Sequence, residues 1–162
     1  MSLKLYFLRH GQAGDWREWE GDDAERPLTA DGKKRMRREA AAIRKLDLPL
    51  DAIITSPLVR AAQTAGIVAK AQSASVRLVT DRRLAPGFGP RHLAAILAAH
   101  RDAGGLMLVG HEPDFSETIS RVAGGGRLTM KKGALAHVEM EDPGSLTGTL
   151  VWLIPPKVLE LW

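Results

Sequence analysis

Two histidines and two arginines stand in short polar segments that follow apolar runs of the chain. They are Arg9, His10, Arg60 and His111. Together these residue types suit phosphoryl transfer, because a planar guanidinium holds and neutralises phosphoryl oxygens better than an ammonium does. A neutral imidazole can attack phosphorus and carry the group covalently. A second, protonated imidazole can donate to a phosphoryl oxygen as negative charge builds up.

Each of these residues carries little information alone. A single histidine such as His111 is more often structural than catalytic, and Arg60 alone would be an ordinary charge on a helix surface. Their positions are more informative, because an apolar strand has no packing reason to end in Arg9 and His10. The set is therefore a candidate phosphoryl site.

Hydrophobic patterning places the four residues relative to secondary structure. Short apolar runs predict strands over 3–8, 51–55, 76–80, 106–109, 134–140 and 149–154. Segments of helical composition predict helices over 30–46, 57–71, 91–101 and 113–122. Ser56 is expected to cap its helix, with Pro57 at the first helical position, and Pro113 should begin the last helix.

This alternation of strands and helices predicts an α/β fold of three layers. We expect a mostly parallel sheet with helices on both faces and an antiparallel C-terminal hairpin, in one domain spanning 1–162. Ligands of such sheets bind outside the carboxyl ends of the strands, so the polar segments should meet at one rim. Helix starts there, including the one at Ser56, would add N–H groups that bind phosphate, and Gly11 would let the backbone approach it.

Three segments resemble the motifs of the histidine phosphatase superfamily, also called phosphoglycerate-mutase-like. They are residues 8–13, 56–65 and 109–113, in the right order and spacing over nearly the whole chain. Residues 26–32, the short length and the compact ending resemble the SixA-type phosphohistidine phosphatases. The resemblance implies the phosphoglycerate-mutase-like fold and a catalytic phosphate pocket. In that pocket His10 would be the nucleophile and phosphate carrier, with Arg9, Arg60 and His111 around it.

The chain departs from the superfamily pattern in the loop after the third predicted strand. Many members carry a glutamate proton donor there, and Pro86 occupies that place in this sequence. The departure argues against mutase chemistry and against efficient turnover of alkyl phosphates. Glu112 or Asp114, which both lie beside His111, are the candidates to replace the donor.

Three functions fit these observations. The first is a phosphatase that forms a phosphohistidine intermediate and acts on phosphohistidine of another protein, without metal or cofactor. The second is the same chemistry on a small phosphorylated metabolite; the lack of a long insertion after the second predicted helix instead favours an open pocket that admits a protein. The third is a non-catalytic phosphate-binding adaptor, which the presence of all four pocket residues disfavours.

Composition bears on which cofactors and which cellular location we expect. The 162 residues are 44% hydrophobic and 26% charged and include no cysteine, which excludes disulfides and thiolate metal sites. No histidine or carboxylate set has metal-ligand spacing, so no metal is expected. The apolar start is too short for a signal peptide, and no segment is apolar enough to span a membrane. We therefore expect a cytoplasmic protein with no membrane partner.

The net charge of +4 suits an acidic ligand. Much of it lies in residues 33–38, whose spacing is typical of a solvated helix face, with a docking surface as the alternative. No nucleic-acid partner is expected. Trp16 and Trp19 lie in the loop beside the predicted site and form either the packed base of a lid or a contact for a partner protein.

Overall fold

The computed structural model describes residues 2–162, which contain a six-stranded sheet with the order β3-β2-β4-β1-β5-β6. Its strands are β1 (Leu3–Arg9), β2 (Ala52–Thr55), β3 (Arg77–Thr80), β4 (Gly105–Gly110), β5 (Leu135–Asp142) and β6 (Thr147–Ile154). The first four pair in parallel, whereas β5 runs antiparallel to both β1 and β6. The predicted mostly parallel sheet with an antiparallel C-terminal hairpin is confirmed.

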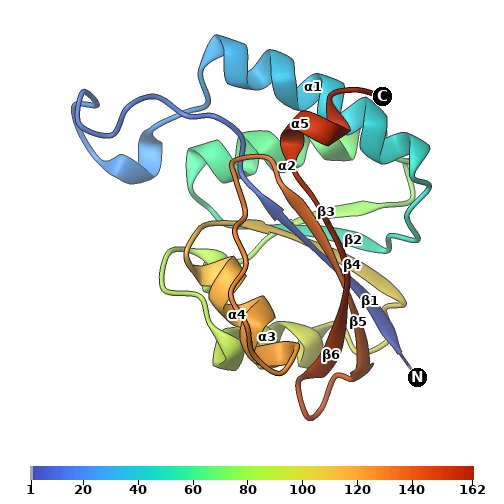
Figure 1. The fold of residues 1–162 in the computed structure, drawn as a ribbon. Helices are drawn as coiled ribbons and strands as arrows, with labels where there is room; N and C mark the ends of the chain where they lie inside the picture. Colours follow the sequence, from blue (N-terminus) through green and yellow to red (C-terminus); the bar gives the residue numbers. More distant parts are fainter. Residues whose placement is uncertain (1) are drawn as a thin grey trace.

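Helices cover both faces of this sheet (Figure 1). One face carries α1 (Ala30–Lys45), α2 (Val59–Ala71) and the short α5 (Pro156–Leu159), and the other carries α3 (Pro90–Ala99) and α4 (Asp114–Val122). Two 3-10 turns, η1 (Asp23–Glu25) and η2 (Arg82–Leu84), interrupt the loops after β1 and β3. The three-layer α/β architecture expected from the sequence is therefore confirmed.

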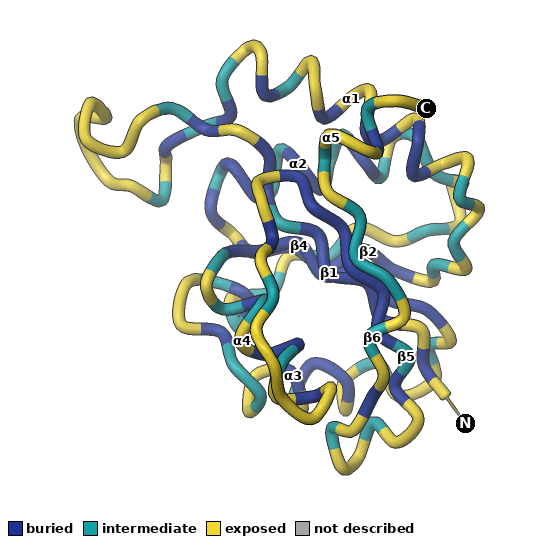
Figure 2. Tube along the Cα trace, in the orientation of Figure 1, coloured by how far each residue is buried: buried dark blue, intermediate teal, exposed yellow. Residues whose placement is uncertain are grey.

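The strand β1 lies in the middle of the sheet and is buried on both faces. Leu5 and Phe7 pack into the core under α3 and α4, while Tyr6 and Leu8 pack into the core under α1 and α2. This alternation follows from the two-residue repeat of a strand. Figure 2 shows the central strands buried along most of their length. The residues that follow β1 and β4 are thus held by a well-packed centre.

Two helix starts differ from the sequence prediction. Helix α2 begins at Val59 with Leu58 at its N-cap, so Ser56 and Pro57 lie before the helix. Ser56 instead continues β2, because its N–H donates to the carbonyl oxygen of Val109 at 3.0 Å. The chain then needs two further residues to turn into the helix. Similarly, α4 begins at Asp114, with Pro113 at the cap position.

Three other features of the fold bear on the predictions. The one-turn helix α5 and the turn η1 were not predicted, since such short elements leave no periodic pattern. In the basic block 33–38, Met36 is buried against the sheet layer while the charged side chains face outward or lie half-buried. This arrangement agrees with a solvated helix face.

Candidate active site

The three polar segments meet at the carboxyl ends of three adjacent strands. In the sheet β4 lies between β1 and β2, and the segments follow these strands directly. The His10 N–H donates to the Gly110 carbonyl at 3.1 Å, and the Ser56 N–H donates to the Val109 carbonyl at 3.0 Å. Strand pairing therefore continues one residue past the regular ladder and places His10, Ser56 and His111 side by side.

The ring of His10 is buried, and one backbone contact orients it. Its Nδ1 lies 2.7 Å from the carbonyl oxygen of Gly11. A carbonyl oxygen only accepts, so Nδ1 carries the hydrogen and Nε2 keeps the free electron pair. Burial lowers the pKa of His10 to about 3, although the bond to the Gly11 carbonyl acts in the opposite direction; the charges of Arg60 and Arg9 lower it further. His10 is thus a neutral imidazole with a nucleophilic Nε2.

The second histidine, His111, lies next to His10, with ring centroids 5.4 Å apart. Burial, and then the charges of Arg60 and Arg9, lower its pKa to about 4. The expectation that His111 is protonated is therefore wrong for the protein by itself, because an imidazolium would be buried beside two arginines. A phosphoryl dianion bound next to the ring would favour the protonated form again.

A neutral His111 also has a hydrogen to donate. Its Nε2 lies 2.7 Å from the hydroxyl of Ser56, which in turn accepts the Leu58 N–H at 3.2 Å. In the tautomer in which this hydroxyl donates to Nε2, the ring hydrogen is on Nδ1. That Nδ1 is buried and has no hydrogen-bond partner within residues 2–162. Such an orphaned donor is matched by an acceptor on a ligand.

The two predicted arginines, Arg9 and Arg60, each also have one buried N–H donor without a hydrogen-bond partner among the described residues. Arg9 donates from Nη1 to the Met130 carbonyl at 2.9 Å, and Arg60 donates from Nη1 and Nη2 to Asp23 at 2.8 and 3.1 Å. The Nε atoms of Arg9 and Arg60 are buried without a partner among the described residues. Burial lowers the pKa of both guanidinium groups from its usual value, yet both remain cationic.

The structure places Ser56 and Gly11 behind the cavity rather than in its wall. Ser56 is fully buried and positions the His111 ring. The Gly11 N–H donates to the Thr64 hydroxyl at 3.0 Å, and a Cβ at Gly11 would lie 2.6 Å from Cγ of Met36. The missing side chain therefore lets α1 pack against the loop, and the approach of the backbone to a phosphate is not what this glycine provides.

A cavity of about 590 Å³ opens where the segments meet. Its wall holds all four predicted pocket residues and further side chains, among them Gln12, Asp15, Trp16, Arg17, Arg26, Pro86, Glu112 and Lys132. Sequence reasoning did not assign Arg26 or Lys132 to the site. Arg26 lies in the segment 26–32 that carried part of the family resemblance, so that motif was the available signal. No sequence signal connected Lys132 to the other residues.

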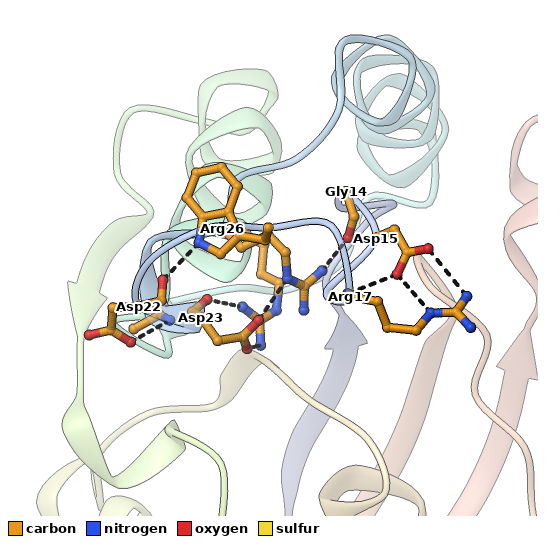
Figure 3. A network of polar contacts seen from close by, with 9 residues as sticks. Gly14, Asp15, Arg17, Asp22, Asp23 and Arg26 are labelled. Atoms are coloured by element: carbon orange, nitrogen blue, oxygen red, sulfur yellow. Dashed lines mark hydrogen bonds and ion pairs between the residues drawn. The ribbon is translucent and has the colours of Figure 1, made fainter.

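The loop after β1 is tied to the site by charged side chains (Figure 3). Asp23 accepts from Arg26 Nε at 2.8 Å as well as from Arg60, so one carboxylate joins two arginines. Arg26 also donates to the Gly14 carbonyl at 2.6 Å. Arg17 pairs with Asp15 through two bonds of 3.2 Å, and these bonds lower the pKa of that carboxyl.

Two tryptophans of this loop differ in environment. Trp19 donates from Nε1 to the Asp22 carbonyl at 2.9 Å, so it stabilises the loop from within. Trp16 lines the cavity but leaves 68% of its surface exposed. Trp19 therefore fits the packed base of the loop, whereas Trp16 is available for contact with a bound molecule.

The carboxylates of the wall bear on the missing proton donor. Pro86 lines the cavity and has no proton to give. Glu112 also lines it, with Oε1 accepting the Ser116 N–H at 2.8 Å. Asp114 lies outside the wall and accepts the Gly87 N–H at 2.9 Å. Of the two proposed substitutes, only Glu112 reaches the cavity.

Across residues 2–162, no three histidine, aspartate or glutamate side chains are grouped so that they could hold a metal ion. Over the same residues, none of the helices has the length and apolar character needed to cross a bilayer.

Comparison with known proteins identifies the family. Residues 5–87 match the model of the histidine phosphatase superfamily (branch 1). An uncharacterized protein of Picosynechococcus sp. is 38% identical over 143 residues, which cover 82% of each chain. The structure of the protein histidine phosphatase SixA complexed with tungstate is similar, with a TM-score of 0.81, 23% identity and coverage of 96% of this chain and 98% of that one. The structure of a putative alpha-ribazole-5'-P phosphatase from Escherichia coli K-12 is also similar. Its TM-score is 0.73 and its identity is 16%, and the match covers 95% of this chain and 97% of that one. The match over His10, Arg60 and the loop up to Pro86, together with this relative, shows that the chain belongs to the histidine phosphatase superfamily.

Proposed function

We propose that this protein is a phosphatase that forms a covalent phosphoenzyme on His10 and removes phosphate from phosphohistidine of another protein. Membership of the superfamily supports phosphatase activity. The neutral, oriented ring of His10 and the unpartnered N–H groups of Arg9, Arg60 and His111 support the covalent route. The adaptor alternative is weaker, because this machinery is complete.

The chemistry proceeds in two displacements. In the first, Nε2 of His10 gives its electron pair to phosphorus while the bond to the leaving group breaks and its electron pair departs with that group. Arg9 and Arg60 hold the phosphoryl oxygens, and the Nδ1–H of His111 donates to one of them. The Gly11 carbonyl accepts from Nδ1 of His10 and so stabilises the positive charge that the phosphorylated ring acquires. Water then attacks phosphorus, the bond to Nε2 breaks, and a proton is released.

The observation that carries the choice of substrate is Pro86 in the cavity wall. An alkoxide leaving group needs a proton, and a placed general acid supplies roughly 10²–10⁴-fold in rate. The imidazole of phosphohistidine is protonated from solvent before its bond to phosphorus breaks, so it leaves without such an acid. The similar structure named as a protein histidine phosphatase is consistent with this choice.

A panel of substrates tests the proposal. We expect the rate to fall from a phosphohistidine protein to an activated aryl phosphate and then to a sugar phosphate. His10→Ala should abolish all three activities, whereas His100→Ala, beyond the end of α3, should keep them. Rapid quenching with labelled substrate should trap an acid-labile, base-stable phosphoenzyme in the wild type alone.

Two outcomes of the panel would contradict the proposal. A sugar phosphate cleaved as fast as the phosphohistidine protein would favour a phosphatase of small metabolites instead, as the similar alpha-ribazole-5'-P phosphatase is described. In that case Glu112→Gln should cost most of the sugar-phosphate rate, since Glu112 is the candidate donor in the wall. Activity retained by His10→Ala would rule out the covalent route altogether.

A further inference from the structure

Lys132 lies in a turn that is fastened to the nucleophile's own strand end. The Gly133 N–H is shared between the carbonyls of Arg9 and His10, each at 3.1 Å. On the other side of Lys132, the carbonyl of Met130 accepts from Arg9 Nη1 at 2.9 Å. Gly133 has φ +87, and a Cβ there would lie 2.5 Å from a carboxylate oxygen of Glu39. The turn therefore has little freedom, and it holds Lys132 at the edge of the cavity.

The ammonium of Lys132 has cations as its neighbours. Within residues 2–162 it makes no ion pair or side-chain hydrogen bond, although it lines the cavity. Lys132 is an exposed residue, like Lys131, yet desolvation at the cavity edge and the charges of Arg9, Arg26 and Arg60 lower its pKa, and Asp15 opposes them. Asp15 is itself paired with Arg17, so it offsets this repulsion only in part. A bound anion would offset the remainder.

The cavity wall holds more cationic side chains than the two that would hold a phosphoryl group. Five cationic side chains and two carboxylates line it. One of these carboxylates, Asp15, is already engaged by Arg17. Asp23 pairs with Arg26 and Arg60 from outside the wall. With a phosphoryl dianion held by Arg9 and Arg60, Lys132 is therefore the cation of the wall that has no acidic partner among the described residues. Arg26 is almost fully buried and uses Nε and Nη1 within the protein, while its Nη2 is not engaged.

We propose that Lys132 and Arg26 form a second anion subsite beside the phosphoryl pocket, so that the preferred substrate carries a second anionic group next to its phosphoryl group. The inference rests on the proposed phosphatase function and adds to it the chemistry of the group that surrounds the phosphate. Two sources supply such a group: an acidic side chain near the phosphohistidine, or a second phosphoryl group on the substrate.

Lys132 is the residue to change, because Arg26 also holds the loop through Asp23 and Gly14. Its neighbour Lys131 is exposed and lies outside the cavity wall, which makes Lys131→Gln a matched control. Lys132→Gln removes the charge and keeps most of the length. Lys132→Arg keeps the charge and should behave like the wild type.

The probes are inorganic phosphate and pyrophosphate, with binding measured by calorimetry. For Lys132→Gln we expect the Kd of pyrophosphate to rise about fivefold or more, as for one charge-assisted contact at a partly exposed position, and that of phosphate to change less than about twofold. Lys131→Gln should change neither. If the Kd values of phosphate and pyrophosphate rise equally, Lys132 belongs to the phosphoryl pocket itself. If neither Kd changes, Lys132 binds neither anion. Either result overturns the proposed subsite.

A second measurement distinguishes the sources of the anionic group. Phosphohistidine peptides with Glu or Gln beside the phosphorylated residue should differ in KM for the wild type and become equal for Lys132→Gln. If pyrophosphate discrimination holds but the peptides do not differ, the subsite stands and its group is a second phosphoryl. If neither peptide is hydrolysed while pyrophosphate discrimination holds, the proposed substrate fails and the subsite remains. The anion measurements need no turnover, so the two failures are distinguishable.

Discussion

The Gly11 carbonyl, 2.7 Å from Nδ1 of His10, determines which nitrogen of that ring keeps a free electron pair. Nε2 keeps the free electron pair, so phosphate should be carried on Nε2 and not on Nδ1. His111 is oriented in a comparable way by Ser56, at 2.7 Å from its Nε2. Each ring thus uses one nitrogen for support within the protein and leaves the other for chemistry. The supporting partners, a backbone carbonyl and a serine hydroxyl, hold no charge of their own.

The lowered pKa values of His10 and His111 predict how stability depends on pH. The unfolded chain binds protons on both rings below about pH 6.5, whereas the folded chain does so only near pH 3 and 4. The free energy of unfolding should therefore be highest above about pH 6.5 and should decrease as the pH falls from there toward pH 4 and 3. Denaturant unfolding at pH 7 and pH 5 should show a clearly smaller free energy of unfolding at pH 5.

The double variant His10→Asn, His111→Asn is the matching test of this assignment. It should abolish the fall in stability from pH 7 to pH 5, because both titrating rings are gone. His100→Asn, outside the cavity wall, should leave the dependence as it is in the wild type. A double variant with an undiminished slope would show that other groups carry it.

The role proposed for Arg60 leads to a prediction about kinetics. Arg60→Ala should lower kcat/KM at least about tenfold, since charge-assisted bonds are worth about 1.5–3 kcal/mol each. Lys should rescue poorly, because it loses the planar fork of donors. Arg60 also holds Asp23, so part of the loss reflects the loop. Asp23→Asn keeps Arg60 and should cost clearly less; Arg77→Ala, exposed on β3, should cost nothing. Normal kinetics for Arg60→Ala would remove it from the phosphate pocket.

Among the elements, α1 carries a buried acid that meets the turn of Lys132. Glu39 is 2% exposed, and one of its oxygens has no hydrogen-bond partner within residues 2–162. The same carboxyl lies where a Cβ of Gly133 would be. Burial, and then the charge of Glu160, raise the pKa of Glu39 to about 8. The carboxyl is therefore protonated at neutral pH, and the packing of α1 against the turn depends on that proton.

This buried acid predicts a pH dependence opposite to that of the histidines. Between about pH 4.5 and 8 the folded chain keeps the Glu39 proton while the unfolded chain loses it, so this group's contribution to stability falls as the pH rises. Glu39→Gln should raise the Tm at pH 8 and reduce the decline. Glu117→Gln, exposed on α4, should do neither. A lower Tm at pH 8 for Glu39→Gln would mean that the ionised carboxylate stabilises the fold.

For the whole molecule, the sequence allowed the fold and part of the site to be predicted. Strand ends could be read from apolar runs, and parallel strands bring their carboxyl ends to one edge. That logic placed His10 and His111 together. Strand ends could not predict the position of Lys132, because it depends on the turn before β5. They also could not predict the ion pair of Arg60 with Asp23, which joins helix α2 to the loop after β1. That logic also misjudged Ser56, because the strand continued where a helix start was expected.

The position of β1 between β4 and β5 has a consequence for how the protein is made. The turn that contacts Arg9 and His10 and the strand that closes the far side of β1 both come from residues beyond 129. A nascent chain on the ribosome therefore exposes one edge of β1 until this late segment emerges. Such pairing between early and late residues raises contact order and slows folding. The cavity wall is complete only when this late segment, which carries Lys132, has docked.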